Sequence, residues 1–113
     1  MSADDYAIEW MGPRAVVTLP AEIDVTNADR AREVLLAAAS QGPAVLIVDM
    51  SQTTFCDSAG VQAIVVAYRQ ATGTQFRLVA TAVARILSLV GIGEIIPIHS
   101  SLDAALDATA PGR

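Results

Sequence analysis

The sequence predicts one α/β domain with a mixed, mostly parallel sheet, and three observations predict it. An unbroken apolar run at 44–48 is rich in β-formers and lacks alternation, which is typical of a central strand covered on both faces. Short apolar segments alternate with segments of helical spacing, and this order favours right-handed crossovers between parallel strands. The chain has 113 residues, 53% of them hydrophobic, which suffices for a single core. We therefore expect one domain over residues 1–113, ordered from about 5 to 108, with the element order ββαβαβαβα.

The first two strands are expected to form an N-terminal hairpin. Tyr6, Ile8 and Trp10 alternate with the period of a strand. Gly12 and Pro13 then predict a turn into a second strand at 15–19. This hairpin would supply the antiparallel part of the sheet.

A loop that carries Asp24 leads to the first expected helix. Thr26 and Asp29 resemble a capping box with aspartate in place of glutamate, so the helix is predicted to begin there. Gly42 and Pro43 end it. Its apolar positions recur at spacings of three and four: Ala28, Ala31, Val34, Leu35 and Ala38.

The second half of the chain continues the alternation. A helix with apolar positions from Val61 to Tyr68 ends at Gly73, and a strand follows at 76–80. Thr81 is expected to cap a short helix that ends at Gly91. The apolar positions of that helix are Val83, Ile86, Leu87 and Val90.

The last strand and the last helix are expected near the C-terminus. The strand is predicted at 95–98, and Pro97 indicates the edge of the sheet because proline lacks a ladder donor. Ser100 and Asp103 resemble a second capping box before a terminal helix. Residues 108–113 are expected to be a frayed tail.

The most informative stretch is the polar hinge T-F-C-D-S-A-G between the central strand and the following helix. Either Asp57 or Ser58 can cap that helix, and Gly60 can allow close packing. Ser58 can instead present its hydroxyl for modification at an exposed turn. A phosphate there would lie over free backbone N–H groups at the helix start, beside Asp57 and near Asp24. The resulting anionic surface would repel a docked partner without a global rearrangement.

Composition argues against several classes of function. The net charge of −5, from 12 acidic and 7 basic side chains, argues against nucleic-acid binding. All seven basic residues are arginine, so Schiff-base chemistry and a P-loop lysine are excluded. The acidic N-terminus and the single cysteine predict a cytoplasmic protein without disulfides. No apolar run approaches the roughly 18 residues of a membrane span, so no membrane insertion is expected.

No enzyme template fits the chain. The G-x-S-x-G pattern is absent around Ser58, because Cys56 stands in the place of the first glycine. We expect Cys56 to be a small packed side chain and His99, the sole histidine, to be a surface or capping residue. One cysteine and one histidine give no metal-ligand spacing, and the segment at 91–93 lacks the third glycine of a dinucleotide loop. We therefore expect a protein that is not an enzyme and holds no cofactor and no metal.

Four segments together resemble a STAS domain of the anti-sigma factor antagonist kind, from about Ile8 to Leu106. They are the hinge, the strand A-V-L-I-V-D-M before it, the earlier L-P-A-E-I-D and the later V-G-I-G-E-I-I-P-I. The resemblance implies that Ser58 is phosphorylated by a partner that is both an anti-sigma factor and an ATP-dependent serine kinase. A PP2C-type serine phosphatase would reverse the modification. The unphosphorylated protein would bind the kinase and thereby release a sigma factor, regulating transcription.

The resemblance also implies a set of partner-binding residues: Asp24, Asp57, Ser58, Ala59 and Gly60. Asp57 would flank the phosphoacceptor, and Asp24 matches an aspartate near the kinase interface. Ala59 stands where many members have a second serine, and the pair Pro20-Ala21 stands where a glycine commonly precedes the glutamate.

Three further hydroxyls and two broader questions stay open. Ser51, Thr53 and Thr54 could be secondary acceptors, although packing is favoured. The free protein is expected to be a monomer or a weak dimer. The alternative function is a constitutive STAS adaptor of a lipid transporter or stress-signalling scaffold, in which Ser58 is only a helix cap.

Overall fold

The computed structural model describes residues 6–108 as an α/β fold. Five strands form one sheet in the order β1-β2-β4-β6-β7, in which β1 and β2 are antiparallel and the other pairs are parallel. The strands are β1 Ala7–Met11, β2 Arg14–Thr18, β4 Val45–Met50, β6 Gln75–Ala80 and β7 Ile98–His99. The predicted hairpin and the mixed, mostly parallel sheet are therefore confirmed. Apart from its first residue, the expected tail lies outside the described residues.

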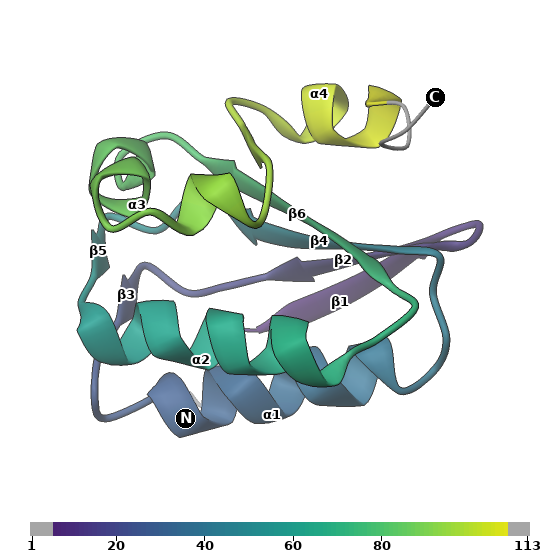
Figure 1. Cartoon of the computed structure of the whole chain (residues 1–113), viewed down its shortest axis with the longest axis horizontal. Helices are drawn as coiled ribbons and strands as arrows, with labels where there is room; N and C mark the ends of the chain where they lie inside the picture. Colours follow the sequence, from purple (N-terminus) through teal and green to yellow (C-terminus); the bar gives the residue numbers. More distant parts are fainter. Residues whose placement is uncertain (1–5, 109–113) are drawn as a thin grey trace.

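Helices cover both faces of this sheet (Figure 1). The two long helices, α1 Ala28–Ala39 and α2 Ser58–Gln70, lie side by side on one face. The short helix α4 Leu102–Asp107 lies on the opposite face. The helix α3 Ala84–Leu89 and the 3-10 turn η2 Ile92–Glu94 connect β6 to β7. The four predicted helices are thus confirmed.

Alternation along the central strand β4 divides its side chains between two apolar cores. Leu46 and Val48 belong to the larger core beneath α1 and α2, whereas Ile47 belongs to the smaller core beneath α4. All three are fully buried. The strand is covered on both faces, as its unbroken apolar run predicted.

Two arginines attach α4 to the sheet. Arg77 Nη1 donates to the carbonyl of Ala105 at 2.6 Å, and Arg14 Nη1 donates to the carbonyl of Leu106 at 3.0 Å. These carbonyls belong to the C-terminal end of α4, where a helix favours cations. Burial, and then the neighbouring Arg14, lower the pKa of Arg77.

Two short strands were not predicted. β3 Glu22–Ile23 and β5 Phe55–Cys56 pair in parallel as a separate two-stranded sheet, with Ile23 opposite Cys56. The sequence was expected to form loops at both places. A strand of two residues carries no measurable periodicity, so the pattern could not reveal it.

The expected capping residues of three helices were wrong. At α1 the N-cap is Asn27, without a side-chain cap bond, and the hydroxyl of Thr26 donates to Asp24 instead. At α3 the N-cap is Val83, and Thr81 donates to the carbonyl of Ser51 at 3.3 Å. At α4 the cap is the next residue, Ser101, whose hydroxyl accepts from Ala104 N.

The last strand and α3 also differ from expectation. β7 comprises Ile98–His99 rather than 95–98, although it does lie at the edge of the sheet. His99 is half-buried in β7 and caps no helix, and its Nε2 atom is buried without a hydrogen-bond partner among residues 6–108. In α3, Leu87 is buried but Ile86 points to solvent and is 47% exposed.

Candidate functional site

The polar hinge places Ser58 at the first residue of α2, directly after the N-cap residue Asp57. One carboxylate oxygen of Asp57 accepts from Ala59 N at 3.0 Å and from Gly60 N at 3.2 Å. Asp57 therefore caps the helix, which answers the question that the sequence left open. The side chain of Ser58 is not needed for capping, and the residue is exposed.

The capping bonds correct one electrostatic expectation. A phosphate on Ser58 would not find those two N–H groups free, because Asp57 already occupies them. The next amide, Val61 N, donates to the backbone carbonyl of Asp57 at 3.1 Å. A phosphate would therefore share the helix N-terminus with a carboxylate, and the two anions would repel each other.

Gly60 lets the first turn of α2 lie close to the two short strands. A Cβ atom at this position would lie 2.7 Å from Cys56 Sγ and 2.7 Å from Ile23 Cγ2. Cys56 is only 4% exposed, and burial, followed by the charge of Asp57, raises the pKa of its thiol to about 11. The expectation of a packed cysteine is confirmed. Gly60 itself is buried, so it fixes the position of the turn and does not belong to its exposed surface.

The small sheet brings Asp24 next to the hinge. Asp24 follows Ile23 at the end of β3, and Asp57 follows Cys56 at the paired end of β5. The backbone N–H of Asp57 also donates to the carbonyl of Ile23 at 3.1 Å. Two of the predicted site residues, 33 positions apart in the sequence, therefore lie on neighbouring strand ends.

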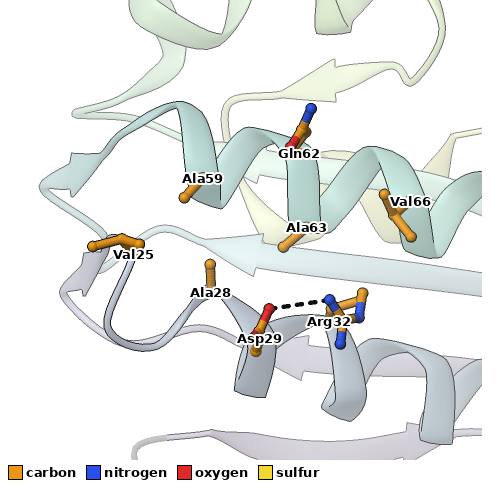
Figure 2. A pocket seen from close by; sticks show the side chains of 8 residues that line it. All are labelled: Val25, Ala28, Asp29, Arg32, Ala59, Gln62, Ala63 and Val66. Carbon is orange, nitrogen blue, oxygen red and sulfur yellow. Dashed lines mark hydrogen bonds and ion pairs between the residues drawn. The ribbon is translucent and has the colours of Figure 1, made fainter.

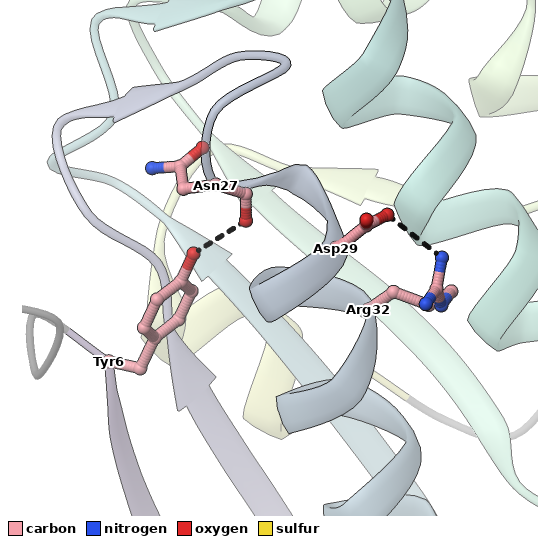
Figure 3. Close-up of polar contacts among 4 residues, drawn as sticks. All are labelled: Tyr6, Asn27, Asp29 and Arg32. Carbon is pink, nitrogen blue, oxygen red and sulfur yellow. Dashed lines mark hydrogen bonds and ion pairs between the residues drawn. The ribbon is translucent and has the colours of Figure 1, made fainter.

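Asp24 organises the loop that it begins. Its carboxylate accepts from the backbone N–H of Thr26 at 2.9 Å and from the Thr26 hydroxyl, and these bonds lower the pKa of Asp24. Asn27 closes the loop by accepting from Asp24 N at 2.9 Å. The Tyr6 hydroxyl in turn donates to the Asn27 carbonyl at 3.2 Å (Figure 3). Val25, at the tip of this loop, is 77% exposed.

A groove between α2 and α3, here called the α2–α3 groove, begins at Ser58. It has a volume of about 750 Å³. Ser58 and Asp57 lie at one end, Arg69 lies near the last turn of α2, and aliphatic side chains line most of the rest. The lining includes Ile86 and Val90, which are 47% and 57% exposed.

The sequence analysis missed this groove because it counted Ile86 and Val90 among the apolar positions of one helical stripe. The available signal was the composition of α3, A-R-I-L-S-L, which has more large apolar side chains than one short helix can bury on a single side.

The neighbouring hydroxyls differ in access. Thr53 is fully buried and donates to the carbonyl of Pro20 at 2.8 Å, so the favoured packing role is confirmed for this residue. The backbone N–H of Thr54 donates to Ala21 O at 2.8 Å, so the Pro20-Ala21 segment is attached to the hinge. Ser51 and Thr54 are exposed.

Within residues 6–108, no group of three or more His, Cys, Asp or Glu side chains is arranged to hold a metal ion. In the same part of the chain, no helix combines the length and hydropathy that a membrane crossing requires.

An exposed serine thus lies beside an aliphatic groove, on a sheet with helices on both faces. Residues 9–105 match the model of the STAS domain family. The chain is also 33% identical over 94 residues to the anti-sigma-F factor antagonist RsfA of Mycobacterium tuberculosis, an alignment that covers 78% of this chain and 73% of RsfA. The chain therefore belongs to the STAS domain family and, within it, to the anti-sigma factor antagonists. Members of this group are regulatory proteins and not enzymes.

Solved structures share this fold. An anti-sigma factor antagonist from Mycobacterium paratuberculosis is 28% identical with a TM-score of 0.83, over 94% of this chain and 96% of that one. The antagonist SpoIIAA in its unphosphorylated form shares the fold at 21% identity with a TM-score of 0.71, over 90% and 93% of the two chains. SpoIIAA in its phosphorylated form also shares the fold, at 20% identity with a TM-score of 0.65, over 90% and 96%.

Proposed function

We propose that the unphosphorylated protein binds an anti-sigma factor that is also an ATP-dependent serine kinase, and that this binding releases a sigma factor. The kinase transfers the γ-phosphoryl group of its ATP to Ser58 Oγ, and a PP2C-type phosphatase removes it. The protein acts in the cytoplasm and is a monomer or weak dimer when free. The observation that carries the proposal is the exposed Ser58 at one end of the α2–α3 groove.

The apolar surroundings of Ser58 support protein docking. Ile86 and Val90 line the α2–α3 groove together with Ser58, Phe55 lies in β5 three residues before Ser58, and Val25 is at the tip of the Asp24 loop. All four are substantially exposed. A cluster of exposed large apolar side chains around one polar residue is typical of a protein interface.

The electrostatics support release on phosphorylation. A phosphoserine carries about −1.5 to −2 charges near neutral pH. At Ser58 this charge would lie beside the capping carboxylate of Asp57 and on the same edge as Asp24. A kinase surface that fits the neutral hydroxyl would then face a concentrated anion, and the complex would dissociate without unfolding the domain.

A phosphorylation assay tests the proposal. The purified protein, incubated with ATP and candidate anti-sigma factor kinases of the same genome, is expected to gain one phosphate by mass spectrometry. Ser58→Ala is expected to gain none, whereas Ser51→Ala, which removes another exposed hydroxyl, is expected to behave as the wild type. A normal gain by Ser58→Ala would refute Ser58 as the acceptor.

The alternative of a constitutive adaptor required Ser58 to be only a helix cap. That role belongs to Asp57 in the structure. A pull-down still separates the two functions, because an adaptor would recover transporter or scaffold subunits equally well with wild type and with Ser58→Glu.

A further inference from the structure

We propose that a second depression on this surface, between α1 and α2, receives an aliphatic side chain from the anti-sigma factor and contributes to the choice of partner. This inference rests on the proposed function. The depression is here called the α1–α2 hollow (Figure 2). Its lining comes from α1, α2 and the loop before α1, whereas the α2–α3 groove lies between α2 and α3.

The hollow exists because small side chains face each other across the two helices. Ala28 of α1 faces Ala59 and Ala63 of α2. The space has a volume of about 190 Å³. Pockets that bind cofactors and other small molecules start at about 300 Å³. The α1–α2 hollow therefore fits one protruding side chain better than a cofactor.

The lining of the hollow favours an aliphatic occupant. Val25 and Val66 lie at its two ends, beside the alanines. Its polar lining comprises Gln62 and an ion pair of Asp29 with Arg32, with 3.1 Å between Oδ1 and Nη1. Because the two charges neutralise each other, the wall attracts neither an anion nor a cation strongly. An aliphatic occupant can bury hydrocarbon against the two valines and three alanines of the lining.

The position of the hollow supports the anti-sigma factor as its partner. Ala59 follows Ser58 directly in the first turn of α2, so a kinase that reaches the Ser58 hydroxyl must also cover Ala59. Three residues of α2, Ala59, Gln62 and Val66, line both the hollow and the α2–α3 groove. The outer side of α2 is thus a ridge between two depressions, and a partner centred on Ser58 spans both of them.

Large side chains introduced from each helix would test this inference, because they would fill the hollow. Ala59→Leu fills it from α2, and Ala28→Leu fills it from α1 without changing the helix that carries Ser58. Gln70→Leu adds the same side chain to the exposed last residue of α2 and serves as the matched control. Affinity for the cognate kinase is measured by calorimetry with ADP in place of ATP, so that Ser58 stays unmodified.

We expect Ala59→Leu and Ala28→Leu, the two filled variants, to bind the kinase at least tenfold more weakly than wild type. Gln70→Leu is expected to bind within twofold of wild type. Circular dichroism and thermal unfolding report whether each variant is folded. Ala59→Val, which adds less volume, replaces Ala59→Leu in the binding assay if the larger side chain unfolds the domain.

Binding by both filled variants within twofold of wild type would overturn the inference and leave the proposed function intact. Sedimentation analysis distinguishes a second occupant. If wild type is a dimer that Ala59→Leu dissociates, while kinase affinity is unchanged, the hollow receives another copy of the chain and the inference is wrong. A wild-type protein that binds no anti-sigma factor kinase would instead refute the proposed function, and the inference would fall with it.

Discussion

Gly60→Ala tests whether the close packing beneath the Ser58 turn stabilises the domain. The added methyl group would lie 2.7 Å from both Cys56 Sγ and Ile23 Cγ2, and 3.2 Å from Ile23 Cβ. Favourable contacts between carbon atoms occur at about 3.5–4.0 Å, so at least one neighbour must move. Ile23 is only 1% exposed, and neither neighbour can move into solvent without losing its packing.

The expected magnitude follows from two opposing effects. Overpacking a well-filled core costs about 1–3 kcal/mol. Replacing glycine by alanine inside a helix stabilises it by about 1 kcal/mol, and by less in the first turn. We therefore expect the free energy of unfolding to fall by about 1–2 kcal/mol. Each kcal/mol lowers Tm by about 4–8 °C in a domain of up to about 100 residues.

Urea unfolding followed by circular dichroism measures this change, and Gly93→Ala is the matched control. At Gly93 the nearest atom to an added Cβ is the flexible end of the Ile98 side chain, at 3.3 Å, so we expect a change within about 0.5 kcal/mol. The reasoning also predicts that Gly60→Ala is less harmful when Cys56→Ala has already removed the sulfur. A Gly60→Ala protein that is more stable than wild type would refute it, because helix propensity alone would then account for the result.

Three further predictions concern the cap, α4 and the thiol. Asp57→Ala should lower the free energy of unfolding by about 0.5–2 kcal/mol in urea titrations because it removes the N-cap, whereas Ser58→Ala should leave it nearly unchanged. Arg77→Ala should lower it by about 2 kcal/mol and speed amide exchange in α4, because a carbonyl of that helix loses a charged donor, and the exposed Arg85→Ala should do neither. The pKa of about 11 for Cys56 lies above its unfolded value, so the stability it contributes is complete below about pH 8.5 and is lost as pH rises towards 11. Iodoacetamide should accordingly react slowly with the native thiol at pH 8 and quickly in urea, and equal rates would contradict its burial.

The sequence predicted those parts of the fold that long patterns specify. The unbroken run at 44–48 identified the doubly covered central strand, and alternation identified the hairpin. The hinge was placed correctly because the change from an apolar run to D-S-A-G is abrupt. Its cap stayed ambiguous because Asp57 and Ser58 are both good N-cap residues, and only coordinates show whose oxygen meets the amides.

The parts that could not be predicted depend on contacts between distant segments. The pairing of β3 with β5 involves two residues from each strand, which are too few to leave a pattern in the sequence. Asp24 and Asn27 exchange bonds inside their loop, so Thr26 is drawn away from the capping role that its position suggested. The exposed Ile86 has the spacing of a core residue. Periodicity cannot distinguish an apolar residue that packs in the core from one that stays exposed.

The pairing of β3 with β5 has a consequence for the strength of the proposed recognition. It fixes the Asp24 loop and the Ser58 turn to one another before any partner arrives. A binding protein therefore loses little conformational entropy to order these segments on contact. Under the proposed function, much of the free energy of contact can then appear as affinity for the partner.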